Sequence, residues 1–301
     1  MNENATIQAE SAPAIKYGWL RAVLFLISAL IVSAIFTFVG VVILAGVFGY
    51  DFASLSTNAR DFIKDIGLPA NITVSFFGFL GMLGTAWIFR KFIDKKSFTS
   101  LGFEFVKFKT DFVFGFLGGF VLIALGFFIL YLMGNLTVNE VSFNWLYIFG
   151  YLLLFSIGAL NEEIMIRGYI LNNFFDSMNK YIALIISSLL FAAMHLANAN
   201  ITYLSVTNIF LAGILLGIYY VHKQNLWLPI SLHFSWNFFQ GPIFGFEVSG
   251  VDVTGAISQN IEGSDLITGG EFGFEGSIIA TLLMVIAIVI LHFKYQEKSS
   301  A

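Results

Sequence analysis

The chain has 301 residues and a formal net charge of −4; 58% of its residues are hydrophobic, 17% aromatic and 11% charged, and its mean hydropathy is +0.85. A soluble domain carries about 25% charged residues, so this composition excludes a soluble globular protein and predicts an integral membrane protein. The absence of cysteine excludes disulfides, thiolate metal ligands and a cysteine nucleophile.

Long apolar segments follow one another along the chain. A bilayer core of about 30 Å requires roughly 20 apolar helical residues. This length predicts eight spans, at about residues 19–48, 71–91, 111–134, 144–174, 180–198, 201–222, 225–245 and 276–293. The predicted fold is therefore all-α and polytopic, with one transmembrane helical domain that covers residues 1–301.

The charged residues of the connections predict the orientation. Lys and Arg fall on alternate loops, most densely between the second and third spans, whereas residues 246–275 contain six acidic residues and no basic one. Because cytoplasmic loops collect Lys and Arg, we expect both termini in the cytoplasm, in a bacterial plasma membrane. The Gly-rich acidic segment 246–275 is then extracytoplasmic, where its composition favours a flexible connection over a lid above a cavity.

Ionisable groups interrupt three of the predicted spans. The fourth span contains Glu162, Glu163 and Arg167, the fifth contains His195, and the seventh contains His233 with Asn237 one turn further on. Residues four apart share a helix face, which predicts a Glu163–Arg167 ion pair and leaves Glu162 free to point elsewhere.

A count of helical rise places these groups at one depth. His195 lies fifteen residues beyond Lys180, or about 22 Å at 1.5 Å per residue. Glu162 reaches this level if the fourth span continues to the polar residues near Asp176. Unpaired charges at such a depth cost about 3 to more than 10 kcal/mol each, so their convergence indicates a functional site.

The residue types suit hydrolysis of an amide bond. A carboxylate can take a proton from water while a histidine helps to orient that water, and a second histidine with an Asn amide can stabilise an oxyanion. Serine catalysis is less favoured, because Ser235 lies about 200° around the helix from His233 and is expected to face away.

Three motifs carry a family resemblance. They are Glu162-Glu163-x-x-x-Arg167, Phe191-x-x-x-His195 and His233-x-x-x-Asn237. In order, spacing and placement on apolar helices they resemble the motifs of the CAAX prenyl protease and bacteriocin-processing (CPBP, or Abi) family of intramembrane proteases. The resemblance covers a predicted catalytic core of about residues 143–246.

The resemblance implies roles for these side chains. It implies Glu162 as the general base with His195 beside it, His233 and Asn237 as the oxyanion site, and Glu163 with Arg167 as a supporting pair. The family is often described as metalloproteases, and Glu162, His195 and His233 could supply three Zn²⁺ ligands. The sequence leaves metal-bound and metal-free water open, although the paired glutamates differ from the His-Glu-x-x-His pattern of zincins.

We therefore expect an intramembrane endopeptidase that acts on a membrane-associated protein or peptide. Its expected partners are this substrate and the lipid bilayer, and no nucleic acid. Two alternatives stay open. One is a non-catalytic immunity or scaffold protein that keeps the motifs as a structural polar network. The other is a proton- or ion-coupled transporter, which would explain the buried carboxylates but not the His-x-x-x-Asn pair, and the sequence shows no internal repeat.

Overall fold

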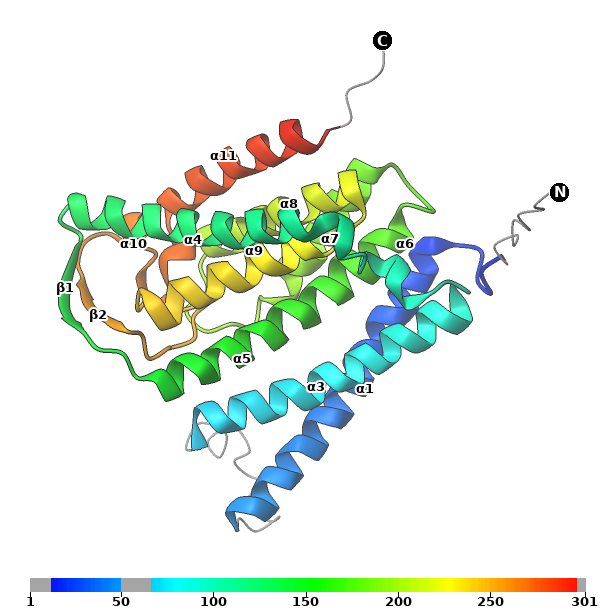
Figure 1. Ribbon diagram of the computed structural model, residues 1–301, viewed down its shortest axis with the longest axis horizontal. Helices are drawn as coiled ribbons and strands as arrows, with labels where there is room; N and C mark the ends of the chain where they lie inside the picture. Colours follow the sequence, from blue (N-terminus) through cyan, green and yellow to red (C-terminus); the bar gives the residue numbers. More distant parts are fainter. Residues whose placement is uncertain (1–11, 50–65, 297–301) are drawn as a thin grey trace.

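The computed structural model describes residues 12–49 and 66–296, and it is mainly helical (Figure 1). Each predicted span coincides with a long helix. These helices are α1 (Gly18–Phe48), α3 (Leu68–Ile88), α4 (Lys109–Leu132), α5 (Trp145–Glu163), α7 (Lys180–Met194), α8 (Tyr203–Lys223), α9 (Trp227–Phe238) and α11 (Ile278–Tyr295). Six helical segments in the described residues are long and apolar enough to cross a membrane, and α7 and α9 are shorter. The all-α polytopic fold is confirmed, whereas eight spans and cytoplasmic termini stay predictions.

Short elements join or extend the long helices. The π-helical segments are η1 (Phe89–Ile93), η4 (Ile164–Leu171) and η5 (Phe239–Ile243). The 3₁₀ turns are η2 (Phe98–Leu101), η3 (Val106–Phe108), η6 (Gly270–Phe272) and η7 (Phe274–Gly276), and the short α-helices are α6 (Asn172–Phe174) and α10 (Asp265–Thr268).

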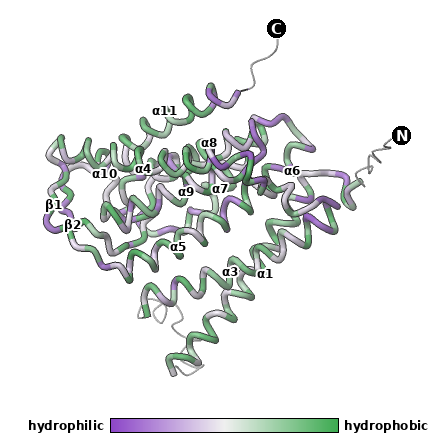
Figure 2. The backbone as a smooth tube through the Cα atoms, in the orientation of Figure 1, coloured by the Kyte–Doolittle hydropathy of each residue, from purple (hydrophilic) through white to green (hydrophobic). Residues whose placement is uncertain are grey.

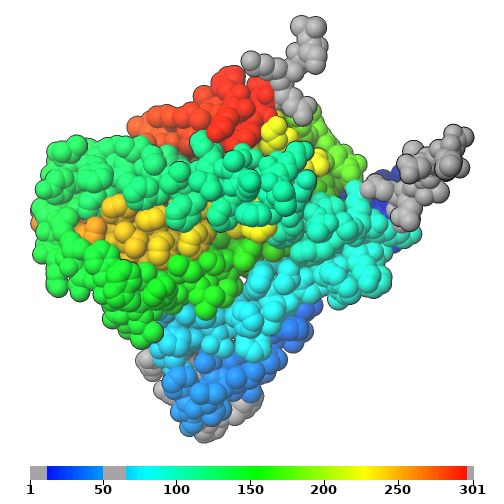
Figure 3. Space-filling model, in the orientation of Figure 1, coloured from blue at the N-terminus to red at the C-terminus, as the bar shows by residue number. Residues whose placement is uncertain are grey.

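The helices pack in neighbouring pairs. α1 packs mainly on α3, α4 on α9, and α8 on both α7 and α11. The α4–α9 contact depends on glycine, because a Cβ atom on Gly115 would lie 2.3 Å from Ser231 Oγ and 2.5 Å from the Leu228 carbonyl oxygen. Small residues permit such close helix approach in lipid. Atoms of α9 are visible between α4 and α5 on the face shown in Figure 3.

Hydrophobic residues predominate along the helices, and hydrophilic residues gather at helix ends and in connections (Figure 2). Leu132 at the end of α4 is 81% exposed and Leu146 at the start of α5 is 80% exposed. Such a surface is unfavourable in water but ordinary against lipid, which agrees with an integral membrane protein.

The acidic segment 246–275 is folded, contrary to the flexible connection that its composition favours. Its strand β2 (Ile257–Ile261) pairs antiparallel with β1 (Leu136–Val141), so that Leu136 lies opposite Ile261. The pair lies at one end of the helical bundle (Figure 1). Phe272 and Phe274 are buried and anchor the segment to the helices. Apolar side chains and strand pairing thus order a segment that Gly and acidic residues alone would leave loose.

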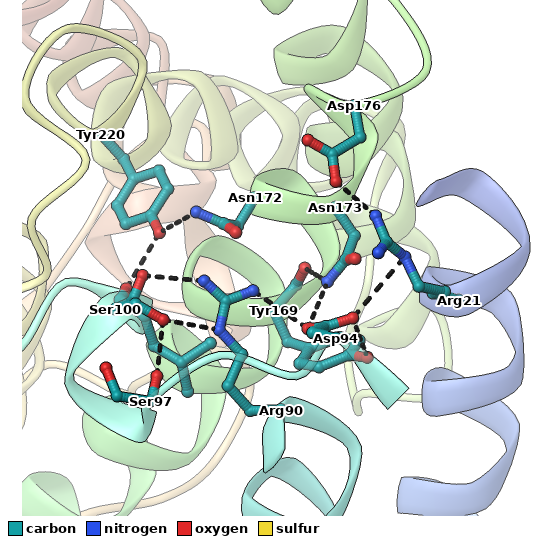
Figure 4. Close-up of polar contacts among 11 residues, drawn as sticks. Arg21, Arg90, Asp94, Ser97, Ser100, Tyr169, Asn172, Asn173, Asp176 and Tyr220 are labelled. Carbon is teal, nitrogen blue, oxygen red and sulfur yellow. Dashed lines mark hydrogen bonds and ion pairs between the residues drawn. The ribbon is translucent and has the colours of Figure 1, made fainter. Parts of the chain in front are cut away.

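A network of buried charges, here called the helix-end cluster, joins α1, η1 and the end of the fourth span (Figure 4). It comprises Arg21, Arg90, Asp94, Ser100, Tyr169, Asn173 and Asp176. Asp94 lies 2.9 Å from Arg90 Nη1 and 3.5 Å from Arg21 Nε, and it accepts a 3.2 Å hydrogen bond from the Tyr169 hydroxyl. The cluster fixes the polar end of this span at the residues near Asp176 that the depth count requires.

Candidate active site

Glu162 and Glu163 occupy the last turn of α5, where the helix changes to the π-helical segment η4. A π-helix accommodates an extra residue and changes the direction in which later side chains point. The hydrophobic sequence Ile164-Met165-Ile166 gives no local sign of this change. Glu163 and Arg167 are fully buried, whereas the Glu162 side chain is 27% exposed to the interior cavity described below.

Arg167 is held on three sides. Its Nη1 donates to Glu163 Oε1 at 2.8 Å, and its Nη2 donates to the Gly213 carbonyl oxygen of α8 at 3.1 Å. The guanidinium also lies over the Phe191 ring, 4.5 Å from its centroid. The Arg167 side chain therefore joins η4 to α7 and α8 as well as to Glu163. Its pairing and stacking also allow an arginine to remain charged in the interior.

Glu163 has a second partner that spacing did not predict. His233 Nδ1 lies 2.8 Å from the same Oε1 atom, so the carboxylate joins α5 to α9 as well as to Arg167. A carboxylate only accepts, so Nδ1 carries the proton and Nε2 points away from Glu163. This arrangement fixes the ring, and it favours the imidazolium form that an oxyanion donor requires. A contact between helices far apart in sequence leaves no periodic signal.

His195 lies one residue beyond the end of α7, which corrects the predicted helix over residues 180–198. Its Nδ1 lies 2.8 Å from the Phe191 carbonyl oxygen, one of the carbonyls freed where the helix ends. A carbonyl only accepts, so Nδ1 again carries the proton and Nε2 is turned outward. The helix therefore stops early because the ring, in place of the next turn, satisfies its terminal carbonyl.

The two imidazoles meet at Glu162. Its Oε2 atom lies 3.8 Å from His195 Nε2 and 3.9 Å from His233 Nε2. Both distances exceed a direct hydrogen bond and fall in the range that one shared water bridges. Glu162 Oε2 has no hydrogen-bond partner among the described residues although it is buried. Two acceptors, Glu162 Oε2 and His195 Nε2, and one donor, the protonated His233 Nε2, therefore surround one point that a water molecule can occupy.

An internal cavity of about 420 Å³ contains this point. Glu162, His195, His233 and Asn237 all line it, so the residues of the three motifs share one chamber. Ser235 instead donates a 2.5 Å hydrogen bond to the Phe116 carbonyl oxygen of α4 and lies outside the chamber, as its position around the helix predicts.

The same donors bear on the predicted zinc site. Two imidazole nitrogens and a carboxylate oxygen are the chemistry that Zn²⁺ prefers. Within the described residues, however, no group of three His, Cys, Asp or Glu side chains is arranged to hold a metal ion, and Glu162, His195 and His233 are no exception. The chemistry below is therefore derived from these side chains and water alone.

An integral membrane protein whose carboxylate and two imidazoles face one internal cavity has the layout of an intramembrane hydrolase. Residues 143–239 match the family model described as type II CAAX prenyl endopeptidase Rce1-like. The match confirms the resemblance seen in the three motifs, and it supports a CAAX-protease-like intramembrane endopeptidase in general. No curated protein and no solved structure matched the chain significantly.

Proposed function

We propose that the protein hydrolyses a peptide bond of a membrane-associated protein or peptide inside this cavity. The convergence of His195 Nε2 and His233 Nε2 on the unpartnered Glu162 oxygen carries the proposal. Buried acceptors without partners are costly, so the fold keeps them where a ligand or water completes their bonding.

Glu162 acts as the general base in this proposal. Its carboxylate takes one proton from the water that attacks the carbonyl carbon, and His195 Nε2 accepts a hydrogen bond from the same water. Glu163 holds His233 in the orientation and charge state that stabilise the oxyanion, with Asn237 as the second donor on the same helix face. Arg167 holds the Glu163 side chain in place.

The experiment is a comparison of membrane-protein termini between cells that carry wild-type protein and cells that carry Glu162→Gln. New termini that depend on Glu162 support a peptidase and identify its substrate. Arg167→Lys is a useful companion, because it retains the charge but loses the fixed guanidinium contacts to Gly213 and Phe191, and we expect reduced but measurable cleavage.

Two other results would redirect the interpretation. Identical termini in both strains, together with loss of folded protein in the Glu162→Gln strain, would favour the scaffold. Zinc that co-purifies in stoichiometric amount with wild-type protein and is lost in His195→Ala would show that Glu162, His195 and His233 bind a metal ion, as the family resemblance allows.

A further inference from the structure

A third carboxyl group, Glu275, lines the cavity that contains Glu162, His195 and His233. It belongs to η7, just before α11, and so lies outside the three motifs and outside the family-matched residues 143–239. Sequence alone assigns it to an acidic external connection. The folding of that connection brings it to the site.

Several polar contacts hold Glu275 there. Asn208 Nδ2 of α8 donates to the Glu275 carbonyl oxygen at 2.8 Å and to the Ser277 carbonyl oxygen at 2.9 Å, which fixes the backbone. The Ser249 hydroxyl donates to Glu275 Oε1 at 2.6 Å. The carbonyl oxygen of Ser249 in turn accepts a 3.0 Å hydrogen bond from Asn198, three residues after His195.

Ser249 has an unusual backbone for this contact. Its φ angle is +52°, in the left-handed region that non-glycine residues seldom adopt. A glycine in place of Ser249 would adopt this φ angle with less strain, as the neighbouring Gly250 does at +78°. Strain kept at a cavity wall points to a functional constraint, and here it aims the hydroxyl at Glu275.

Glu275 differs from the buried carboxylates Glu163 and Asp94 in having no arginine partner among the described residues. Glu163 pairs with Arg167, and Asp94 pairs with two arginines, but no Lys or Arg of the described residues pairs with Glu275. Burial raises the pKa of Glu275, against the opposing effects of its hydrogen bond from Ser249 and the charges of His195 and His233. The other titratable groups that line the cavity are Tyr151, Glu162, His195, His233 and Asp252.

We propose that Glu275 is the general acid that protonates the leaving amine, a role that rests on the peptidase activity proposed above. In the first step Glu162 takes a proton from water as the water oxygen bonds to the carbonyl carbon. In the second step the carbon–nitrogen bond breaks, its electron pair goes to nitrogen, and nitrogen takes the proton of Glu275. The products are a carboxylic acid and an amine, and transfer of the proton from Glu162 to Glu275 through water restores both groups.

The test compares an amide with an ester. A peptide that spans the cleavage site found by the terminus comparison is made with an amide at the scissile bond and, separately, with an ester. An alkoxide leaves with far less help from an acid than an amine does. We therefore expect Glu275→Gln to lower kcat on the amide by about 10²–10³-fold and on the ester by less than about tenfold.

Two variants complete the design. Glu162→Gln removes the base needed for attack, and so is expected to lose both activities. Glu247→Gln changes a carboxyl of the same segment that does not line this cavity, and both of its rates should equal those of wild-type protein.

Each outcome separates the two proposals. Equal losses on amide and ester in Glu275→Gln would show that Glu275 only supports the fold, and would leave the peptidase intact. No cleavage of either compound by wild-type protein would overturn the peptidase and the general acid together. A selective loss on the amide, partly restored in Glu275→Asp, would establish proton donation.

Discussion

Two buried clusters of charge lie at different places in this helical bundle, and they treat their carboxylates differently. In the helix-end cluster both oxygens of Asp94 have partners, from Arg21, Arg90, Tyr169 and Asn173. At the cavity, Glu162 Oε2 has no hydrogen-bond partner among the described residues. A complete network is a structural device, whereas acceptors left open beside a cavity are available to water and substrate.

The two clusters are linked through one short segment. Tyr169 of η4 donates to Asp94, and Arg167, two residues earlier, pairs with Glu163. The closed cluster thus anchors the segment from which the open one is built. Preorganisation of this kind lets a site keep costly open groups without losing its geometry.

Replacement of Glu162 gives the largest expected difference between the clusters. Glu162→Gln should lower cleavage by about 10²–10⁴-fold, because the proton acceptor is lost. Its melting temperature in detergent should stay at the wild-type value or rise, since Glu162 Oε2 has no hydrogen-bond partner among the described residues. Cleavage rate and thermal unfolding of the same preparation test both parts, and a large drop in melting temperature would assign Glu162 a structural role instead.

The opposite result is expected at Asp94. Asp94→Asn leaves the buried Arg90 without a countercharge and Arg21 with only the partly exposed Asp176, which should reduce the free energy of unfolding by about 3–5 kcal/mol. The activity per folded molecule should change little, because the cavity residues keep their partners.

Asp176→Asn is the matched control for this variant. The Asp176 side chain also pairs with Arg21 but is 46% exposed, so the loss should stay below about 1 kcal/mol. Urea or thermal unfolding in detergent measures both variants. Equal losses in the two would contradict the assignment of Asp94 as the centre of the cluster.

The features that depend on one helix at a time were predictable from sequence. Apolar length located the long helices, four-residue spacing predicted the approach of Glu163 to Arg167, and the rotation per residue predicted that Ser235 faces away from the cavity. The depth count also placed the end of the fourth span near Asp176. These inferences need only the rise and the period of a helix.

The features that depend on contacts between distant segments were not predictable. The bond from His233 to Glu163 joins α9 to α5, two helices far apart in sequence, and no residue of η4 signals a π-helix. The early end of α7 at Met194 depends on which carbonyl the His195 ring reaches. Glu275 reaches the cavity only because β2, Phe272 and Phe274 fold the acidic segment back on the bundle.

Glu163 sharpens the comparison because it has features of both clusters. Its Oε1 serves Arg167 and His233, while its Oε2 has no hydrogen-bond partner in the described part of the chain. Glu163→Gln should therefore lower both the cleavage activity and the thermal stability. We expect about 10–100-fold lower activity, as for other partners that orient a working histidine, together with a lower melting temperature. Loss of stability with full activity would show that His233 keeps its orientation without the carboxylate.

The smallest expected effect concerns the pH dependence of stability, which separates Glu275 from the paired carboxylates. Burial raises the pKa of Glu275 in the folded protein above its value of about 4.3 in the unfolded chain. Between these two values only the folded state holds the proton, so the contribution of this group to stability is fully present below the unfolded pKa and falls as pH rises toward the folded one.

Glu275→Gln removes this titration. Relative to wild-type protein, the variant should gain melting temperature as the pH rises from about 4 to neutrality, and the difference should level off above the folded pKa. Glu162→Gln, measured over the same range, controls for titration of the rest of the cavity. A difference between Glu275→Gln and wild-type protein that grows toward low pH would mean that Glu275 is held as a carboxylate, which is the charge state of the paired groups and not that of a proton donor.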